Sequence, residues 1–416
     1  MAKKWKDPLY GAVLYGQSGG PSAVINASAY GVIKTALESV HVTKVYAAEN
    51  GILGILDERL MVMNKEDPEE LERLLHTPSS AFGSCRYKIA APEDDETDYK
   101  RILDIFESYN IRYFFYNGGN DSMDTCNKIS RYLKKKRYDC HIIGVPKTID
   151  NDLYGTDHCP GFASAAKYIA TSIMEASRDS HVYNTGLITI IECMGRHAGW
   201  LTAAAVLASE NCDGPDLIYL PEVDFDMQDF LDDVIRVYEG KGSCMVAVSE
   251  GIHYADGTFV SEAKTSATDG FGHAQLGGLA AKLTAIVRAA TGAKVRGIEL
   301  SLLQRCAAHC ASQTDIDEAF RAGEFAVESA IAGESGKMVG FSCSRRNGYT
   351  CKLVLVNLED VANEEKKIPL SWITSDNSFV GEKFVQYCRP LLAGEPQRET
   401  VDGLPRFAKL KKVFTR

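Results

Sequence analysis

The stretch that decides the fold is Pro146-Lys-Thr-Ile-Asp-Asn-Asp152, which directly follows the apolar run 141–145. Such a run is typical of a buried strand, so the polar residues begin where the strand ends. Open α/β sheets place their chemistry at that edge. Because Asp150 and Asp152 are separated by one residue, they can serve different tasks, one binding a metal ion and the other accepting a proton.

Two further polar turns follow predicted strands. Gly118-Gly-Asn-Asp-Ser122 precedes a helix predicted over 123–133, and Gly16-Gln-Ser-Gly-Gly20 links a predicted strand over 11–15 to a helix over 22–37. Because glycine lacks a Cβ, backbone N–H groups at such a turn can approach an anion, and the helix that follows adds its dipole. A glycine turn can also be only a tight connection, so this pattern alone leaves phosphate binding open.

Two cations stand in the predicted loop Phe82-Gly-Ser-Cys-Arg-Tyr-Lys88. Arg86 and Lys88 are separated by one residue, so in an extended loop both side chains point the same way and could bind one anion. The alternative is that both are solvated surface charges. The loop by itself does not decide between these interpretations.

Strands and helices alternate along the rest of the chain, with a helix predicted over 98–108, strands over 111–116 and 141–145, and the same rhythm repeated after a long helix over 162–178. This alternation is typical of parallel, doubly wound sheets. A chain of 416 residues is also longer than one core usually covers. We therefore predict an α/β fold of two doubly wound lobes, with mainly parallel sheets and the active site in the cleft between them.

Composition and charge narrow the class of ligand. The formal net charge of -10 and the pI near 5.5 disfavour a nucleic-acid surface, so a phosphorylated ligand must be met by local cations. The twelve cysteines are scattered, and Lys3 and Lys4 interrupt the start of the chain, so we expect a cytoplasmic protein without a membrane partner. Cys306, His309 and Cys310 lie at helical spacing, but without a second ligand pair this favours a buried helix face over a metal cluster.

Together the turns resemble motifs of the phosphofructokinase family. The matching stretches follow the family's order over residues 10 to about 310, and they are Ser18-Gly-Gly20, Gly118-Gly-Asn-Asp-Ser122, Pro146-Lys-Thr-Ile-Asp-Asn-Asp152, Met194-Gly-Arg196, Glu250-Gly251 and Gln304-Arg305. The resemblance implies Mg²⁺-dependent transfer of a phosphoryl group to the 1-hydroxyl of fructose 6-phosphate. It also implies a donor-binding lobe over 1–160, completed by about 306–355, and a sugar-phosphate-binding lobe over 161–305, completed by 356–416.

The resemblance assigns roles to single residues. Asp150 resembles the base that accepts the proton of the sugar hydroxyl, and the other catalytic candidates are Lys147, Thr148, Asp121 and Arg196. The implied donor-binding residues are Gly19, Gly20, Arg86, Lys88, Asp121 and Lys147. The implied sugar-phosphate pocket consists of Thr148, Asp150, Met194, Gly195, Arg196, Glu250 and Arg305. Arg296 resembles the arginine that reaches the sugar 6-phosphate of a neighbouring subunit, which implies a homodimer or homotetramer with shared active sites.

Three positions depart from the family's usual pattern. Asn120 stands where an aspartate commonly holds Mg²⁺, so metal binding should rest more on Asp152 and on the oxygens of the donor. Leu302 stands where His or Tyr is usual, and Leu187 stands where a second cross-subunit arginine often lies. These differences leave altered sugar recognition or a broader sugar substrate open.

Two residues indicate the phosphoryl donor. Members that use a nucleotide generally carry glycine at the position of Asp121 and a small residue at that of Lys147, whereas the diphosphate-using branch carries Asp and Lys. A carboxylate at position 121 would repel the α-phosphate of ATP, and Lys147 offers a cation to the short, highly charged diphosphate. Alternatively, Asp121 only caps the following helix and Lys147 is its salt-bridge partner.

We therefore predict a reversible Mg²⁺-dependent phosphotransferase of central sugar metabolism that converts diphosphate and fructose 6-phosphate to phosphate and fructose 1,6-bisphosphate. One alternative is an ATP-dependent 6-phosphofructokinase, which requires Asp121 to turn away from the nucleotide. A second is a non-catalytic regulatory subunit that binds sugar phosphates. Asn120 and Leu302 favour the regulatory subunit, whereas the intact set Lys147, Thr148, Asp150 and Arg196 opposes it.

Overall fold

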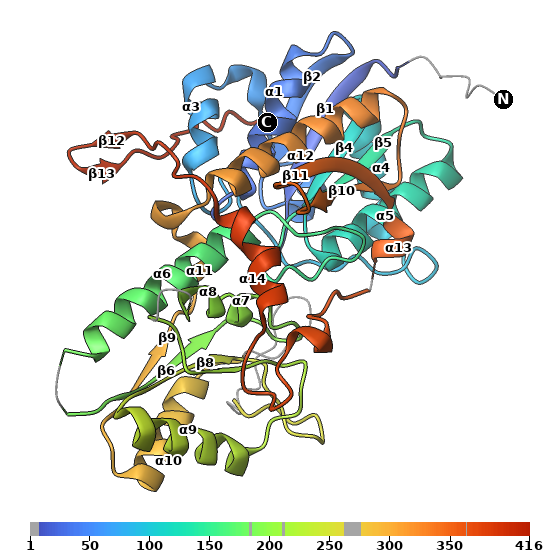
Figure 1. Ribbon diagram of the computed structural model, residues 1–416. Helices are drawn as coiled ribbons and strands as arrows, with labels where there is room; N and C mark the ends of the chain where they lie inside the picture. The colour runs from blue at the N-terminus through green and yellow to red at the C-terminus, as the bar shows by residue number, and fades with distance from the viewer. Residues whose placement is uncertain (1–7, 183–184, 210–212, 262–275, 363) are drawn as a thin grey trace.

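The computed structural model describes residues 8–182, 185–209, 213–261, 276–362 and 364–416. Its strands form two main sheets, each buried between helices (Figure 1). The two-lobed α/β fold predicted from the sequence is confirmed. The start of the chain, with Lys3 and Lys4, lies outside the described residues.

The larger sheet has seven strands in the order β11-β10-β5-β4-β1-β2-β3. Most neighbours run parallel, but β3 runs antiparallel to β2, and β11 runs antiparallel to β10. The bounds are β1 (Gly11–Gln17), β2 (Val42–Ala48), β3 (Leu60–Val62), β4 (Ile111–Gly118), β5 (His141–Pro146), β10 (Lys337–Ser344) and β11 (Thr350–Asn357).

Helices cover both faces of this sheet because side chains alternate along each strand. Val13 and Tyr15 of β1 pack in one core with α1 (Ile25–Glu38), α3 (Pro68–Glu72) and α12 (Gln313–Ile331). Ala12 and Leu14 pack in the opposite core. The helices of that second core are α2 (Ile52–Leu56), α4 (Thr97–Ser108), α5 (Asn120–Lys136) and α13 (Leu358–Val361).

The smaller sheet has four parallel strands in the order β7-β8-β6-β9. Their bounds are β6 (Ile188–Cys193), β7 (Leu217–Tyr219), β8 (Cys244–Ser249) and β9 (Val295–Glu299). One face packs against α6 (Phe162–Ser180), α7 (Trp200–Ala203), α8 (Val206–Ser209) and α14 (Glu382–Cys388), and the other against α9 (Met227–Lys241) and α10 (Leu279–Thr291).

Short elements complete the described chain. They are α11 (Leu303–Cys306), the hairpin strands β12 (Thr400–Val401) and β13 (Leu404–Pro405), and the 3-10 helices η1 (Met63–Lys65), η2 (Arg73–His76), η3 (Ala308–Cys310), η4 (Leu370–Trp372) and η5 (Arg389–Leu392). Ala307, between α11 and η3, has a non-helical ψ of 68°. Cys306, His309 and Cys310 therefore do not share one helix. His309 is exposed, so the predicted buried face is wrong at this position.

The end of the chain differs from the sequence-based assignment. The sequence analysis assigns residues 356–416 to the sugar-phosphate lobe, but near the end of this segment Phe414 forms a bridge with Met61 of the larger sheet. The carboxylate of Glu66 accepts hydrogen bonds from the backbone N–H groups of Lys411 and Lys412 at 2.7 and 2.8 Å. These contacts are long-range, so the local sequence pattern did not indicate them. The other lobe boundaries stay a prediction.

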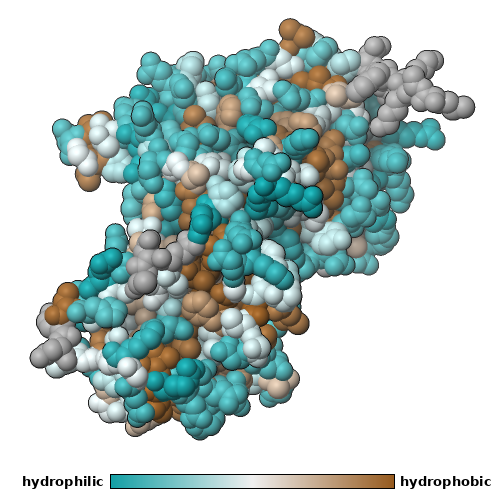
Figure 2. All heavy atoms as spheres, viewed as in Figure 1, coloured by the Kyte–Doolittle hydropathy of each residue, from teal (hydrophilic) through white to brown (hydrophobic). Residues whose placement is uncertain are grey.

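The molecular surface is largely hydrophilic on the face shown in Figure 2. The hairpin of β12 and β13 projects from the body of the protein (Figure 1). Among the helices of the described ranges, none is long and apolar enough to cross a membrane.

Candidate active site

A cleft of about 600 Å³ lies where strands from both sheets end. Five strands deliver polar residues to it, because in each case the chain leaves the sheet at the carboxyl end of a strand, as in open α/β sheets generally. Among the residues that sequence analysis singled out, the cleft is lined by Gly19, Gly20, Arg86, Lys88, Asn120, Asp121, Lys147, Thr148, Asp150, Asp152, Met194, Arg196, Glu250 and Arg305.

The turn after β1 meets the residue after β5. Gly19 has a φ of +74°, a conformation that favours glycine. The ammonium of Lys147 donates a 2.6 Å hydrogen bond to the carbonyl oxygen of Gly20. A Cβ at position 19 would lie 3.3 Å from the same nitrogen, which is tighter than ordinary contact. The glycines therefore leave room for Lys147 to reach across the cleft floor.

Lys147 is buried, with only 4% of its surface exposed. Burial lowers its pKa to about 8, while the charges of Asp150 and Asp152 act in the opposite direction. At neutral pH the side chain therefore remains mainly an ammonium. A desolvated cation at this depth attracts an anion more strongly than a surface lysine would.

Asp150 stands at the centre of the charged groups. Its backbone N–H donates to the hydroxyl of Thr148 at 3.1 Å, which fixes the turn that carries the carboxylate. Burial raises the pKa of Asp150, and Lys147, Arg305 and Arg196 oppose that shift. A carboxylate whose pKa is raised in this way is a stronger base than an ordinary surface aspartate.

Asn120 and Asp152 form a site that fits a hard metal ion. The amide of Asn120 donates to Asp152 Oδ2 at 3.1 Å. Asn120 Oδ1 and Asp152 Oδ1 are buried and have no hydrogen-bond partner within the described part of the chain. Carboxylate and amide oxygens are the ligands that Mg²⁺ accepts. Burial, followed by the charges of Asp150 and Glu365, raises the pKa of Asp152 to about 7.

Asp121 lies in the first turn of α5, which begins at Asn120 and not at residue 123 as predicted. The residue that precedes the helix is Gly119, and no side chain caps this end. The carboxylate of Asp121 lies 3.7 Å from the ammonium of Lys88. The capping interpretation is therefore wrong, and the salt-bridge partner of Asp121 is Lys88 and not Lys147.

The opposite wall of the cleft comes from the smaller sheet. Gly195, which follows β6, has a φ of +136° and donates its N–H to Glu250 Oε1 at 3.3 Å. The neighbouring N–H of Met194 donates to Gln304 Oε1 at 3.1 Å. Burial raises the pKa of Glu250 to about 7. Gly195 itself shapes this wall without lining the cleft.

Arg305 brings a cation from the smaller lobe to the glycine turn that follows β1 in the larger lobe. A Cβ on Gly20 would lie 3.2 Å from Arg305 Nη1. Burial and the nearby charge of Arg86 lower the pKa of Arg305, and both residues line the cleft, Arg305 half-buried and Arg86 exposed. Like charges held together in this way favour a polyanionic ligand between them.

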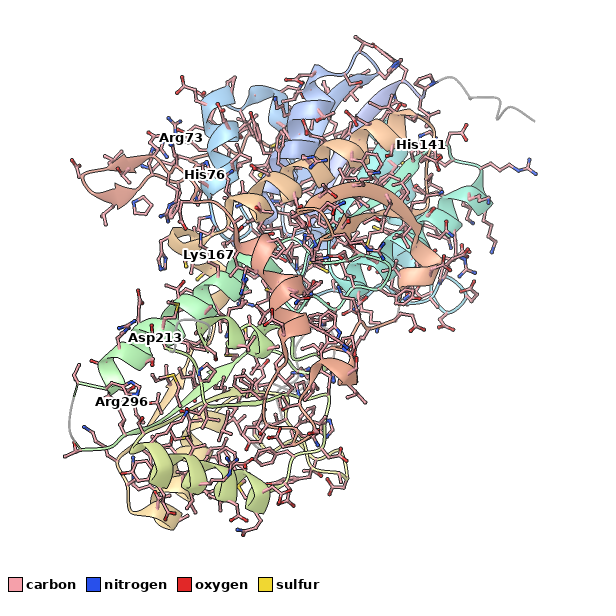
Figure 3. All side chains as sticks on the ribbon, viewed as in Figure 1. Arg73, His76, His141, Lys167, Asp213 and Arg296 are labelled. Carbon is pink, nitrogen blue, oxygen red and sulfur yellow. The ribbon has the colours of Figure 1, made fainter. Side chains whose placement is uncertain are left out.

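Arg296 does not line the cleft of its own chain. It extends from β9, is half exposed, and lies 3.4 Å from Asp179 at the end of α6. Figure 3 shows it at the outer edge of the smaller sheet. Leu187 is buried in this lobe, and Leu302 is 53% exposed.

The sequence analysis assigned no role to the other lining residues, which are Pro21, Gly119, Ser122, Ile149, His197, Ala198 and Glu365. Pro21, Gly119, Ser122, Ile149, His197 and Ala198 directly adjoin or lie within the quoted motifs, so their positions in sequence could have indicated them. Glu365 carries no such signal. It reaches the cleft because a bridge pairs it with Leu153, just after Asp152.

Comparisons with known proteins identify the family. A family model described as phosphofructokinase matches residues 12–330. Two curated proteins named pyrophosphate–fructose 6-phosphate 1-phosphotransferase are similar over nearly their whole length. The one from Halomonas elongata is 44% identical over 96% of each chain, and the one from Xanthomonas campestris is 46% identical over 97% of each. A crystal structure titled pyrophosphate-dependent phosphofructokinase from Marinobacter aquaeolei superposes with a TM-score of 0.87 and 41% identity, covering 98% of this chain and 97% of that one.

Proposed function

The chain belongs to the phosphofructokinase family, and we propose that it transfers a phosphoryl group from diphosphate to the 1-hydroxyl of fructose 6-phosphate. The observation that carries this proposal is the position of Lys147, whose ammonium bonds to Gly20 while Asp150 stands beside it. In-line phosphoryl transfer requires a cation beside the bound phosphoryl donor and a base next to that cation.

Asp150 serves as the base. A sugar bound against Arg196 and Glu250 would present its 1-hydroxyl to this carboxylate, which accepts the proton as the oxygen attacks phosphorus. Lys147, Arg86 and Arg305 then face the negative charge that is spread over the transferring group. Because the hydrogen bond to Gly20 holds Lys147 in place before the substrates arrive, this cation stabilises the transition state at little reorganisation cost.

Donor choice rests on Asp121 and Lys88. Their ion pair narrows the cleft next to the first turn of α5. It also places the Asp121 carboxylate where the α-phosphate of a bound ATP would lie. Diphosphate ends before that point. Lys147 meets the leaving phosphate, whose charge is concentrated on few oxygens.

Asn120 and Asp152 are the residues we infer to hold Mg²⁺, because each keeps one buried oxygen without a partner among the described residues. When bound, the ion would neutralise charge on the phosphoryl oxygens. The amide of Asn120 also orients the carboxylate of Asp152 through their shared hydrogen bond.

We further propose an oligomer with shared active sites and a cytoplasmic location. The outward position of Arg296 supports the first, since an exposed guanidinium on β9 can reach a partner subunit. The eleven cysteines in the described ranges are all free thiols, which supports a reducing compartment.

The test is the initial rate with fructose 6-phosphate and Mg²⁺, with diphosphate in one reaction and ATP in the other. Activity with diphosphate alone is expected. Activity with ATP alone would reject the role of Asp121 while keeping Asp150 as base. If neither donor gives activity but calorimetry still shows binding of fructose 6-phosphate, the protein would be a regulatory subunit.

A further inference from the structure

A pair of cysteines faces one another outside the cleft. Cys343 of β10 and Cys351 of β11 are direct partners in the antiparallel register, and both are partly exposed. Residues opposed in this way have Cα atoms about 4.5–5.5 Å apart, which is within the range that a disulfide spans. Both cysteines are free thiols.

A buried imidazole stands beside this pair. His158 is 1% exposed, and its Nδ1 lies 3.8 Å from the sulfur of Cys343. Its two ring nitrogens contact carboxylates, Nε2 with Glu318 at 2.7 Å and Nδ1 with Asp157 at 3.1 Å. These partners raise the pKa of His158 well above its ordinary value, so the ring is an imidazolium at neutral pH.

Cys343 is the thiol that this environment ionises. The neighbouring Cys351 and His158 lower its pKa to about 6, although burial acts in the opposite direction. The Tyr349 hydroxyl lies 3.5 Å from the sulfur. The neighbouring Cys343 and burial raise the pKa of Cys351, so that thiol keeps its proton. One reactive thiolate and one neutral thiol therefore lie at directly opposed positions of the two strands.

The same residues do not offer a ready metal site. Ligand atoms of Asp157, His158 and Cys343 lie within 4.8 Å of one another. However, both oxygens of Asp157 are held by the guanidinium of Arg345 at 2.8 and 2.7 Å, and the contacts of His158 with two carboxylates favour the ring that carries both protons. A metal ion would have to displace a proton and an arginine, whereas oxidation of the sulfur requires neither.

We propose that Cys343 is a peroxide-reactive thiolate and that Cys351 resolves it to a reversible disulfide across β10 and β11. In the first step the thiolate attacks hydrogen peroxide: an S–O bond forms, the O–O bond breaks and hydroxide leaves. The sulfur is oxidised by two electrons to a sulfenic acid, and the peroxide is reduced.

In the second step the sulfur of Cys351 attacks that of Cys343. The S–S bond forms, the S–O bond breaks, and the leaving hydroxide takes the proton of Cys351 to give water. Loss of the negative charge on Cys343 in the first step removes one cause of the raised pKa of Cys351, so the resolving thiol is easier to deprotonate at the moment it must react.

The experiment treats the full-length protein with hydrogen peroxide at pH 7 and analyses tryptic peptides by mass spectrometry. Arg345 and Arg346 separate the two cysteines, so a disulfide joins two different peptides, 338–345 and 347–352. We expect this linked pair to form and to disappear with dithiothreitol. In Cys351→Ser, a dimedone adduct should accumulate on Cys343, while Cys306→Ser serves as the matched control and should behave as the unmodified chain.

A second measurement requires no variant. Alkylation by iodoacetamide, followed against pH, should reach half its maximal rate near pH 6 for Cys343, and Cys306 is labelled in parallel as the comparison. At pH 7 most of Cys343 but only a few per cent of an ordinary thiol is ionised, a difference of about thirtyfold. The lower nucleophilicity of a low-pKa thiolate offsets part of this difference, so labelling about threefold faster than at Cys306 is expected. Equal rates at the two cysteines, or peroxide treatment that yields no 343–351 link, would overturn the proposal.

Discussion

The side-chain amide of Asn120 donates a 3.1 Å hydrogen bond to Asp152, and each residue keeps one buried oxygen without a partner within the described part of the chain. Two such oxygens at one edge of the larger sheet are poorly satisfied without a ligand, because a buried polar atom that loses its hydrogen bond costs about 1–3 kcal/mol. A divalent cation would remove that cost, so this pair makes the strongest connection between the geometry and a metal requirement.

Replacing this amide tests the metal site. In Asn120→Asp a second carboxylate joins Asp152, and the Mg²⁺ concentration for half-maximal activity should fall several-fold because a charged ligand binds the cation more strongly. Titration of activity against Mg²⁺ measures the change. Asn127→Asp makes the same substitution further along α5, outside the cleft, and should leave the titration unchanged. An unchanged titration in Asn120→Asp would exclude this residue as a ligand.

Removal of the proposed base should separate catalysis from binding. Asp150→Asn keeps the shape of the side chain but cannot accept the proton, so kcat should fall by about 10²–10⁴-fold while the affinity for fructose 6-phosphate stays within about threefold. Steady-state kinetics and calorimetry give the two values. Asp139→Asn, at the opposite end of β5, is the control. If kcat of Asp150→Asn stays close to that of the unmodified chain, another group is the base.

Donor exclusion can be tested at Asp121. Asp121→Gly removes both the side chain and its ion pair with Lys88, and measurable turnover with ATP should appear, more strongly when combined with Lys147→Gly. Asp121→Asn keeps the bulk but removes the charge, so comparison of the two variants separates steric exclusion from repulsion. The absence of ATP turnover in all three variants would reject Asp121 as the excluding group.

The lowered pKa of Lys147 predicts a pH dependence for the donor. Burial brings this pKa to about 8, so the ammonium is charged below pH 8 and loses its charge as the pH rises through that value. For diphosphate, kcat/KM should therefore fall above pH 8, approaching tenfold per pH unit. In Lys147→Arg the side chain keeps its charge throughout this range, so kcat/KM for diphosphate should no longer fall above pH 8. The same fall in Lys147→Arg would assign the titration to another group.

Arg296 predicts complementation between subunits. Arg296→Ala and Asp150→Asn should each be nearly inactive, but a co-expressed mixed oligomer contains some sites with both native residues. For a dimer with two shared sites, random assembly should restore about a quarter of normal activity. Arg236→Ala, another exposed arginine of the same lobe, should remain active by itself. No recovery in purified mixed oligomers would show that Arg296 does not serve a partner's site.

The polar turns could be located from sequence because their signal is local. Apolar runs such as 141–145 are followed within two residues by glycine or a charged residue, and the helical pattern that comes next marks the edge of the sheet. The start of α5 was misplaced by three residues, since Asn120 and Asp121 resemble turn residues more than helical ones. That shift moved Asp121 from a cap position into the first turn.

The sequence by itself determined the two lobes and the strand ends that carry polar residues, and it supplied the presence of both Asp121 and Lys147 as the argument for a diphosphate donor. Only the tertiary structure decided that Lys147 bonds to Gly20, that Lys88 pairs with Asp121, and that Glu365 approaches Asp152. The physical reason is the separation along the sequence of the residues that interact. Strands and turns follow from the conformational preferences of neighbouring residues, whereas these contacts join distant segments whose meeting depends on how the whole core packs.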